Sequence, residues 1–564
     1  MELLDSRRLT GPNLYWNKLG AIIEVCIDDT DPRAIESSWQ KHLQRMLDAL
    51  NWGQADTLSR QFPDFLALVF AAPLDALYAA TEVNEWAFAA MRDELCGVSD
   101  APDFAAESER LKTLVAEEQI PALVNLVNTC HERGIAMHYD DEWASVGLGK
   151  YSITWPVHEI PAVDDIDWSR LGNVPIGFIT GTNGKTTTVR LSAAIAMAAG
   201  LTPGVSSTDW IAVGNEVLDK GDYSGPGGAR RVLQDSRVDI GILEAARGGL
   251  IRRGLALQHA DCAVITNIAE DHMGESGVHD LATLAEVKWV VTQVLSKNDT
   301  LVLNAEDPLL AERGKNSKFN ICFYACDASC STLVAHMKAG GRAMYVEHGI
   351  ITWFDGRSRS KLIAVKDVPL TLGGAAIHNV SNALAAAAFT LQLGISASAI
   401  VSGLKNTRSD ANPGRGNLYR YKGAQFLVDF AHNLHGLDAI FATIDAIQAK
   451  RKLVLLGQAG DRSDDAIRDL VRKVWSLNPD FVIIKEMAEY ARGRAKGEVP
   501  DIIKKELMLL GADESRFTYI EKEIDAAKFA VDWAQEDDLA LLLVHGEKEA
   551  VADYFAGLKS SAND

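Results

Sequence analysis

The stretch GTNGKTTT, which begins at Gly181, combines the residue types that a phosphate-binding site needs. Gly181 and Gly184 would let backbone N–H groups turn inward toward an anion. Lys185 would bring a positive charge to the β- and γ-phosphates of a nucleotide, and either Thr186 or Thr187 would hold a magnesium ion. The glycine spacing is two residues shorter than in GxxxxGK[ST]. The alternative to a phosphate-binding loop is a glycine turn with a surface lysine.

The segments on either side of this stretch favour the phosphate site. Residues 174–180 (VPIGFIT) read as a short apolar strand, and residues 189–199 (VRLSAAIAMAA) carry apolar residues at helical spacing. Strand, glycine turn and helix in this order place backbone N–H groups and a helix N-terminus at one point. Strands and helices then alternate to about residue 412, which predicts a mostly parallel sheet with crossover helices.

Polar residues follow two further predicted strands. Residues 238–243 (VDIGIL) end at Glu244, and residues 262–266 (CAVIT) end at Asn267, which opens the sequence NIAEDH up to His272. Ligands of open α/β sheets lie at the carboxyl ends of strands, so these side chains should lie beside the phosphate loop. A carboxylate and an imidazole there would ligate a divalent cation, or they would simply cap the strand ends.

A lysine stands among apolar residues in the next predicted helix. Residues 281–295 (LATLAEVKWVVTQVL) have helical periodicity and contain Lys288. From this pattern alone an exposed or snorkelling lysine is one interpretation. The other is a lysine kept neutral near the metal, whose amine takes up carbon dioxide and becomes an anionic carbamate ligand.

Composition and charge limit the kind of protein. The chain has 564 residues, 47% of them hydrophobic and 24% charged, so we expect a soluble protein of two to four domains without membrane spans. Seven scattered cysteines and an N-terminus without an apolar signal core indicate the cytoplasm. A formal net charge of −21 argues against nucleic acid as a partner but not against ATP.

The chain divides into four predicted parts. Residues 1–160 form an N-terminal domain of α+β type that is rich in helices, residues 161–173 a linker, residues 174–412 the phosphate-binding domain and residues 413–564 a second doubly wound domain. Within the first part we expect one strand and three helical stretches, at residues 21–27, 37–50, 65–91 and 107–133. Residues 321–372 look like a small antiparallel sheet inserted into the phosphate-binding domain.

Six motifs in a fixed order resemble the Mur ligase superfamily. They are GTNGKTTT, LEAARGG with Glu244, NIAEDH followed by Lys288, HNVSNALAAA, NPGRGN with Arg415, and DFAHN with Asp429. Within the superfamily the closest likeness is to the ligase half of the cyanophycin synthetases, over residues 170–564, and RRLTGPNLYW near the N-terminus is similar to the start of those synthetases. An ATP-grasp domain separates the two parts in that family, and here only the linker region intervenes.

The resemblance implies a multidomain Mur ligase fold, with a P-loop in a central parallel sheet and a Rossmann-like C-terminal domain, and it implies ATP and Mg²⁺ as cofactors. Lys185, His272 and Lys288 would be catalytic, with Lys288 as the carbamylated lysine of the family. Metal would be held by Thr186, Glu244, His272 and Lys288. The nucleotide would be bound by Gly181, Thr182, Asn183, Gly184, Lys185, Thr186, Thr187, Asn267, Asn379, Asn382, Arg415 and Asp429.

The resemblance also implies a reaction. We expect an ADP-forming ligase that activates a small-molecule or peptide carboxylate as an acyl phosphate and joins it to an amino-acid or peptide amine. The alternatives are a poly-γ-glutamate or folyl-type glutamate ligase, and a non-catalytic nucleotide-binding scaffold for a separate ATP-grasp enzyme. We expect a homo-oligomer. The N-terminal domain would either present a polymer to the ligase or only pack and oligomerise.

Two departures from the family pattern and one basic cluster complete the expectations. Leu434 stands where the family often has proline, and residues 457–462 read GQAGDR in place of a GGPGDR-like turn, so the amine site is expected to differ. A basic cluster that would bind an acidic substrate, or form an exposed charged loop, consists of Lys485, Arg492, Arg494 and Lys496.

Overall fold

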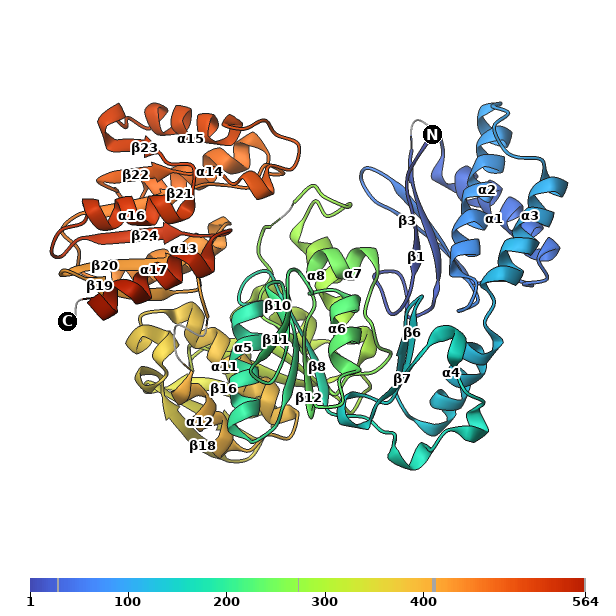
Figure 1. The fold of residues 1–564 in the computed structure, drawn as a ribbon, viewed down its shortest axis with the longest axis horizontal. Coiled ribbons are helices and arrows are strands. Elements are labelled where there is room, and N and C mark those ends of the chain that lie inside the picture. The colour runs from blue at the N-terminus through green and yellow to red at the C-terminus, as the bar shows by residue number, and fades with distance from the viewer. Residues whose placement is uncertain (28–29, 272, 408–411, 562–564) are drawn as a thin grey trace.

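The computed structural model describes residues 1–27, 30–271, 273–407 and 412–561. Figure 1 shows three parts along the longest axis of the molecule, with the N-terminal part in blue at one end and the C-terminal domain in orange and red at the other. The central domain, in green and yellow, lies between them. Within the described ranges, no helix combines the length and apolar character needed to cross a bilayer.

The N-terminal part opens with an antiparallel sheet of order β1-β2-β4-β3. Three helices accompany the sheet, and Trp39 of the first is completely buried and donates a 2.8 Å hydrogen bond from Nε1 to Asn84 of the second. The elements are β1 (Glu2–Leu9), β2 (Gly20–Cys26), α1 (Pro32–Ala49), β3 (Thr57–Gln61), β4 (Leu66–Ala71), α2 (Leu77–Cys96) and α3 (Phe104–Glu118).

The predicted helix over residues 65–91 is wrong in its first third. Residues 66–71 form β4, which pairs with β2 on one side and β3 on the other. Both faces of β4 are buried, each in a different apolar core, so its sequence LALVFA is continuously apolar and lacks the alternation of a half-exposed strand. Such a run reads equally well as helix, which explains the error.

The predicted helix over 107–133 is two helices. The first, α3, ends at Glu118, and the backbone of the next residue, Gln119, is extended. The second, α4 (Pro121–Arg133), begins with proline at its first position, where a missing N–H costs no hydrogen bond. A three-stranded sheet of order β5-β6-β7 follows, made of β5 (Met137–Tyr139), β6 (Trp143–Val146) and β7 (Ile153–Pro156). The predicted linker contains short 3₁₀ turns, and Ile166 and Trp168 pack into a small core with α4.

The central domain is built on an 11-stranded sheet of order β11-β10-β9-β12-β8-β13-β14-β15-β16-β17-β18. Its middle strands, from β9 to β16, run parallel, and antiparallel pairs close both edges. The strands are β8 (Ile176–Thr180), β9 (Pro203–Ser206), β10 (Trp210–Val213), β11 (Glu216–Lys220), β12 (Ile240–Glu244), β13 (Cys262–Ile265), β14 (Thr300–Asn304), β15 (Asn320–Ala325), β16 (Arg342–Glu347), β17 (Ile350–Phe354) and β18 (Arg359–Ala364).

The separate antiparallel sheet expected at residues 321–372 is not found, and this expectation is wrong. β15 pairs in parallel with β14 and with β16, so residues 320–364 extend the central sheet by four strands. Within residues 320–364, the antiparallel pairs are β16 with β17 and β17 with β18. The sequence of a short strand predicts its length and which of its faces is apolar. It does not predict the sheet edge with which the strand pairs, because pairing uses backbone groups that all residues share.

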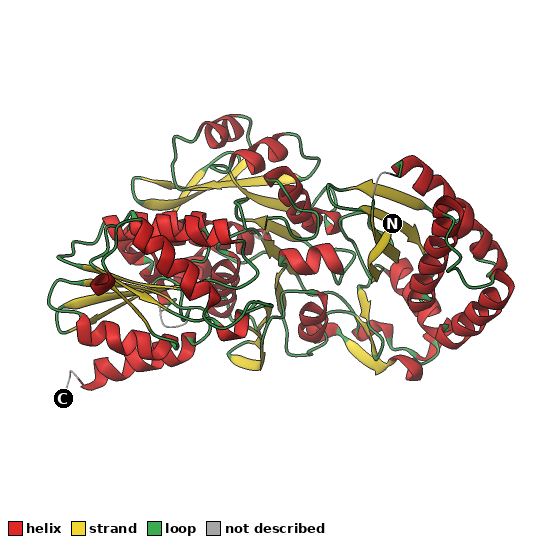
Figure 2. Ribbon diagram, turned by 90° about the horizontal axis from the view of Figure 1, so that it is seen from above, coloured by secondary structure: helices red, strands yellow, loops and turns green. Residues whose placement is uncertain are grey.

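Helices cover both faces of the central sheet, which Figure 2 shows from above. One face packs on α5 (Lys185–Ala198), α11 (Ile377–Gln392) and α12 (Ala397–Asn406). The other packs on α6 (Pro226–Leu233), α7 (Arg247–Arg252), α8 (Leu281–Trp289), α9 (Pro308–Lys315) and α10 (Ser331–Lys338). The sheet is therefore packed between two apolar cores, which hold the carboxyl ends of its strands in fixed positions.

The C-terminal domain has a six-stranded sheet of order β19-β20-β24-β21-β22-β23, also with helices on both faces. The doubly wound prediction is confirmed. Its strands are β19 (Asn417–Tyr421), β20 (Ala424–Asp429), β21 (Lys452–Leu456), β22 (Phe481–Ile484), β23 (Phe517–Tyr519) and β24 (Leu539–Leu543). Its helices are α13 (Leu434–Asp445), α14 (Asp464–Trp475), α15 (Glu498–Leu509), α16 (Glu523–Trp533) and α17 (Lys548–Ser561).

Candidate functional site

The predicted phosphate loop lies between β8 and α5. Gly184 has a φ of +87° and directly precedes α5, so its position favours glycine. The Lys185 ammonium folds back over the loop and donates a 2.9 Å hydrogen bond to the Thr182 carbonyl. The loop therefore presents a helix N-terminus and a lysine at one point, which is the arrangement that binds phosphate.

The neighbouring strand end holds this loop in shape. The order β12-β8-β13 places the end of β13 beside the loop. Asn267 accepts a 2.9 Å hydrogen bond from the Asn183 N–H with Oδ1 and donates one of 2.9 Å from Nδ2 to the Asn183 carbonyl. Thr182 Oγ1 donates to the Ala269 carbonyl at 3.0 Å. The structure thus brings Asn267 to the loop as a brace for its backbone.

Glu244 lies at the end of β12, directly beside β8, and is 2% exposed. Neither of its carboxylate oxygens has a hydrogen-bond partner among the described residues. Burial raises the pKa of Glu244, and the charges of Lys185 and Arg415 oppose that rise. A buried carboxylate without a hydrogen-bonding partner is costly unless a ligand completes it, so this side chain is poised for a cation.

A magnesium ion fits the oxygen atoms at this point. The Thr186 hydroxyl lies at the start of α5, 3.1 Å from that of Thr208, and Glu244 supplies an anionic oxygen nearby. Mg²⁺ prefers such oxygens together with phosphate and water. Thr187 is buried too, and it accepts a 3.2 Å hydrogen bond from Asn412. His272 lies outside the described residues.

Lys288 is in the last turn of α8 and is 3% exposed. Burial lowers its pKa well below the usual value, and the nearby charge of Lys185 lowers it further, while Asp271 opposes both. This shift favours the neutral amine, which is the form that reacts with carbon dioxide. The interpretation as an exposed lysine is wrong, because α8 buries this side chain at the sheet.

A second group of predicted residues packs around Gly184 of the phosphate loop. Asn382 packs against Gly184, since a Cβ built on that glycine would stand 2.2 Å from Asn382 Oδ1. Its Nδ2 donates to Asn379 Oδ1 at 3.2 Å. A Cβ on Gly416 would lie 3.0 Å from Asn379 Nδ2 and 4.0 Å from Asp429 Oδ2. The structure thus joins residues of four motifs around one buried polar patch.

Asp429 ends β20 in the C-terminal domain and is 9% exposed. Burial raises its pKa to about 6, although the Ala431 N–H donates to the carboxylate at 2.7 Å. A buried carboxylate that accepts only part of its capacity in hydrogen bonds suits a ligand hydroxyl.

Arg415 leads into the C-terminal domain and turns toward a buried carboxylate that the sequence analysis did not single out. Its Nη2 lies 3.8 Å from Asp209 Oδ2, and Arg190 contacts the same oxygen at 2.6 Å. Lys548, at the start of α17, pairs with Asp209 Oδ1. Although burial works in the other direction, these three cations lower the pKa of Asp209 to about 2. The cluster joins the central and C-terminal domains beside the phosphate loop.

Two further contacts close the C-terminal domain over the loop. Asn183 and Asn433 exchange hydrogen bonds of 3.2 Å through their side-chain amides. Arg462 Nη2 donates to Asp271 Oδ1 at 2.7 Å. The sequence predicted no role for Asn433 or Arg462, although both lie within motifs quoted from it, and Asp209 lies in none of those motifs. Only the folded chain brings these residues together, because more than 190 positions separate the partners in the sequence.

The predicted basic cluster of the C-terminal domain is not free to bind an acidic substrate as a unit. Lys485 is completely buried and pairs with Glu523. The other three cations each pair with an acidic neighbour in the same domain: Arg492 with Asp461, Arg494 with Asp464 and Glu498, and Lys496 with Glu521. The charges are therefore largely neutralised locally.

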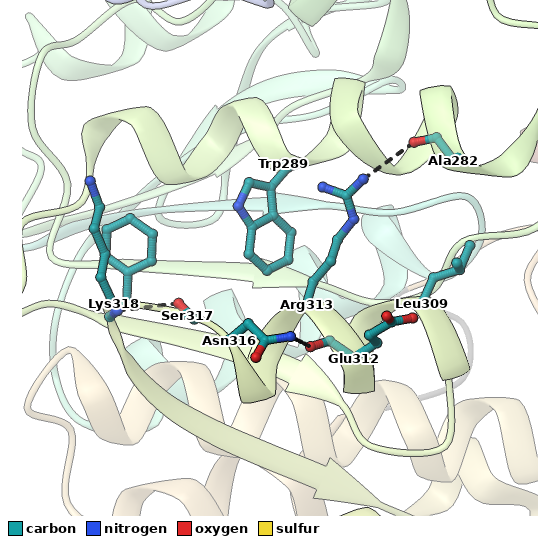
Figure 3. Close-up of a pocket in the computed structure, with 9 residues that line it drawn as sticks. Ala282, Trp289, Leu309, Glu312, Arg313, Asn316, Ser317 and Lys318 are labelled. Carbon is teal, nitrogen blue, oxygen red and sulfur yellow. Dashed lines mark hydrogen bonds between the residues drawn. The ribbon is translucent and has the colours of Figure 1, made fainter.

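A surface hollow of about 630 Å³ lies between α8 and α9 (Figure 3). Trp289, next in sequence to Lys288, stands in it beside Arg313, which donates a 3.4 Å hydrogen bond to the Ala282 carbonyl. None of the predicted site residues lines this hollow. It is separate from the strand-end site.

The fold and the site define a class: an α/β nucleotide-binding domain with a phosphate loop, closed by a second doubly wound domain. Residues 179–390 match the Mur ligase middle domain, and residues 414–546 match the Mur ligase glutamate ligase domain. Over these two domains the chain belongs to the Mur ligase family.

Three curated relatives illustrate the likeness. The chain is 33% identical over 381 residues to the cyanophycin synthetase of Crocosphaera subtropica, covering 67% of this chain and 43% of that protein. It is 36% identical over 334 residues to that of Geminocystis herdmanii, covering 59% and 38%. Against the UDP-N-acetylmuramoyl-L-alanyl-D-glutamate--2,6-diaminopimelate ligase of Syntrophomonas wolfei it is 25% identical, covering 66% and 73%. The chain thus spans less than half the length of the two synthetases.

Proposed function

We propose that this chain is an ATP-dependent, ADP-forming amide ligase of cyanophycin-synthetase-like type. The observation that carries the proposal is the buried Glu244 carboxylate, which accepts no hydrogen bond within the geometric limits among the described residues and interacts with the Lys185 charge and the Thr186 hydroxyl. A carboxylate there is useful only when a cation and phosphates complete the site. The likeness to two synthetases supports a substrate pair of the same general kind, an acidic acceptor and an amino-acid amine.

The chemistry has two steps. A carboxylate oxygen of the acceptor attacks the γ-phosphorus of ATP, and the bond to the bridging oxygen breaks to release ADP. The amine nitrogen then attacks the acyl carbon, phosphate leaves, and the nitrogen loses a proton. Both steps concentrate negative charge, so catalysis depends on positioning and on fixed positive charge.

The residues divide this work. Lys185 and the loop N–H groups would hold the phosphates, and Thr186 and Glu244 would hold magnesium, which supplies positive charge to the phosphate oxygens. Asn379, Asn382 and Asp429 would bind the nucleoside, and Arg415 would reach the phosphates from the domain boundary. His272 and a carbamylated Lys288 would hold a second metal ion at the acceptor. These roles are the ones that the motifs imply.

The test is phosphate release from Mg-ATP by the full chain, against amino acids paired with carboxylate acceptors that include aspartate-containing peptides. Lys185→Ala serves as the blank, and mass spectrometry identifies the product. A product one amide bond heavier than its parts supports the ligase and names both substrates. Glutamate as the amine that reacts would favour the poly-γ-glutamate or folyl-type alternative. ATP binding without any product across the panel would contradict the ligase and favour a scaffold for an ATP-grasp enzyme.

A further inference from the structure

The N-terminal domain contacts the segment that precedes Lys288 through the end of β3 and the loop that follows it. This loop, residues 62–65, joins β3 to β4, and its two phenylalanines stack at 4.6 Å between ring centroids. We call Phe62 and Phe65 the aromatic wedge. It packs on Gly277, where a Cβ would stand 2.7 Å from Phe62 and 2.9 Å from Phe65. Gly277 also has a φ of +73°, so both space and backbone favour glycine there.

Two ion pairs flank the wedge. Asp64, within the loop, contacts His279 Nε2, and Arg60, at the end of β3, contacts Glu286 of α8. The Arg60 guanidinium also lies 4.8 Å from the Phe62 ring centroid. The contacts of the N-terminal domain are thus spread along the segment from Gly277 to α8.

This segment leads directly to the buried lysine. The Gly274 N–H donates to the Val278 carbonyl at 2.8 Å, which closes a tight turn, and Val278 is completely buried in the central core. Asp280 then caps α8 by accepting from the Thr283 N–H at 2.7 Å. Lys288 stands in the last turn of that helix. A displacement of the turn would therefore move the helix that carries Lys288.

We propose that the aromatic wedge and its two ion pairs position residues 273–289, and with them Lys288, so that the N-terminal domain is a positioning part of the ligase site. This inference rests on the proposed function. Asp64 and Arg60 are positioning residues that act through the turn and α8 and touch no substrate. A domain that served only to present a polymer would need no contact with this turn.

The test compares two double variants of the full chain. Arg60→Gln/Asp64→Asn removes both flanking ion pairs, and Lys18→Gln/Asp56→Asn removes another exposed ion pair that lies beside β3 within the same domain. Because all four side chains are partly exposed, both variants should fold. For the first variant we expect faster amide hydrogen exchange in residues 273–289, a weaker carbamate signal after labelling with ¹³C-bicarbonate, and a kcat about fivefold to tenfold lower at unchanged KM for ATP. The second variant should match the wild type in all three.

Gly277→Ala gives a second measure, since its Cβ pushes against the wedge. It should raise exchange in the same residues while exchange at the phosphate loop stays unchanged. The proposal is overturned if exchange and kcat of Arg60→Gln/Asp64→Asn equal those of the wild type, or if both double variants change alike. If no substrate pair gives turnover above the Lys185→Ala blank, the proposed function fails, while the exchange and carbamate measurements still decide whether the wedge positions Lys288.

Discussion

At the scale of single residues, the site contains buried ionisable groups whose charged forms are unfavourable without a ligand. Glu244, Lys288 and Asp429 are each at least nine-tenths buried, and each has a pKa moved toward its neutral form by that burial. Desolvation of a charged group is costly, so such groups cluster where a ligand completes them. The free-energy cost of burying these groups should therefore be seen in the stability and in the turnover of variants at these positions.

Lys288 should be essential through its carbamate. Lys288→Arg keeps a positive charge but cannot form the carbamate, so we expect turnover to fall by about a hundredfold or more. A short added carboxylate such as acetate should restore part of it by taking the place of the carbamate. Phosphate release measures both effects, with Lys297→Arg, an exposed lysine nearby, as the matched control. Turnover of Lys288→Arg equal to that of the wild type would rule out the carbamate.

Asp429 should make the protein without nucleotide less stable as the pH rises. Its folded pKa of about 6 lies above the ordinary value of 3.8, so the stability that its protonated form provides is lost as the pH rises through about 6. Asp429→Asn keeps the acceptor for the Ala431 N–H and should be more stable than the wild type at pH 7.5, by at most about 3 kcal/mol. Urea unfolding at pH 5 and 7.5 measures the gain, which should shrink at the lower pH. A gain that is independent of pH would contradict the ionisation argument.

At the scale of elements, the conformation of the phosphate loop is restricted by its glycine backbone and by the strands and the helix that surround it. β8 ends beside the ends of β12 and β13, and α11 closes the loop from the side through Asn382. The loop backbone is therefore braced by side chains from two other elements before any ligand binds.

Gly184→Ala should damage this loop in two ways. The left-handed φ of +87° strains alanine, and its Cβ would stand 2.2 Å from Asn382 Oδ1. We expect a loss of about 1–3 kcal/mol of stability and at least tenfold weaker ATP binding, measured by thermal unfolding and by calorimetry. Gly200→Ala is the control, since its φ of +78° imposes the strain with nothing within 4 Å. ATP affinity falling equally in both variants would show that the contact with Asn382 is unimportant.

At the scale of the whole molecule, the C-terminal domain is closed onto the central domain by charge. Asp209 receives Arg415 and Lys548 from the C-terminal side and Arg190 from its own domain. Breaking a buried ion pair by removal of one partner leaves the other charges uncompensated. The removal of the Asp209 charge should therefore weaken the closed arrangement, although the contacts of Asn433 and Arg462 remain.

Asp209→Asn should shift the molecule toward an open form. We expect a larger radius of gyration in small-angle scattering and a KM for ATP about tenfold higher, because closure precedes productive binding. Glu549→Gln is the control, since Glu549 pairs with Lys220 across the same two domains at 3.6 Å but is exposed. If the two variants scatter alike, Asp209 does not hold the domains closed.

The sequence alone determined the phosphate loop, the strand ends that carry Glu244 and Asn267, and both doubly wound domains. These features are local, because helical and strand periodicity and a contiguous glycine motif are written within a few residues, and parallel strands bring their carboxyl ends to one edge. The tertiary structure decided that residues 320–364 extend the central sheet, that residues 66–71 are a strand, and that Asp209 and the aromatic wedge contact partners more than 200 positions away. Such contacts depend on how the domains pack, and no local pattern encodes that packing.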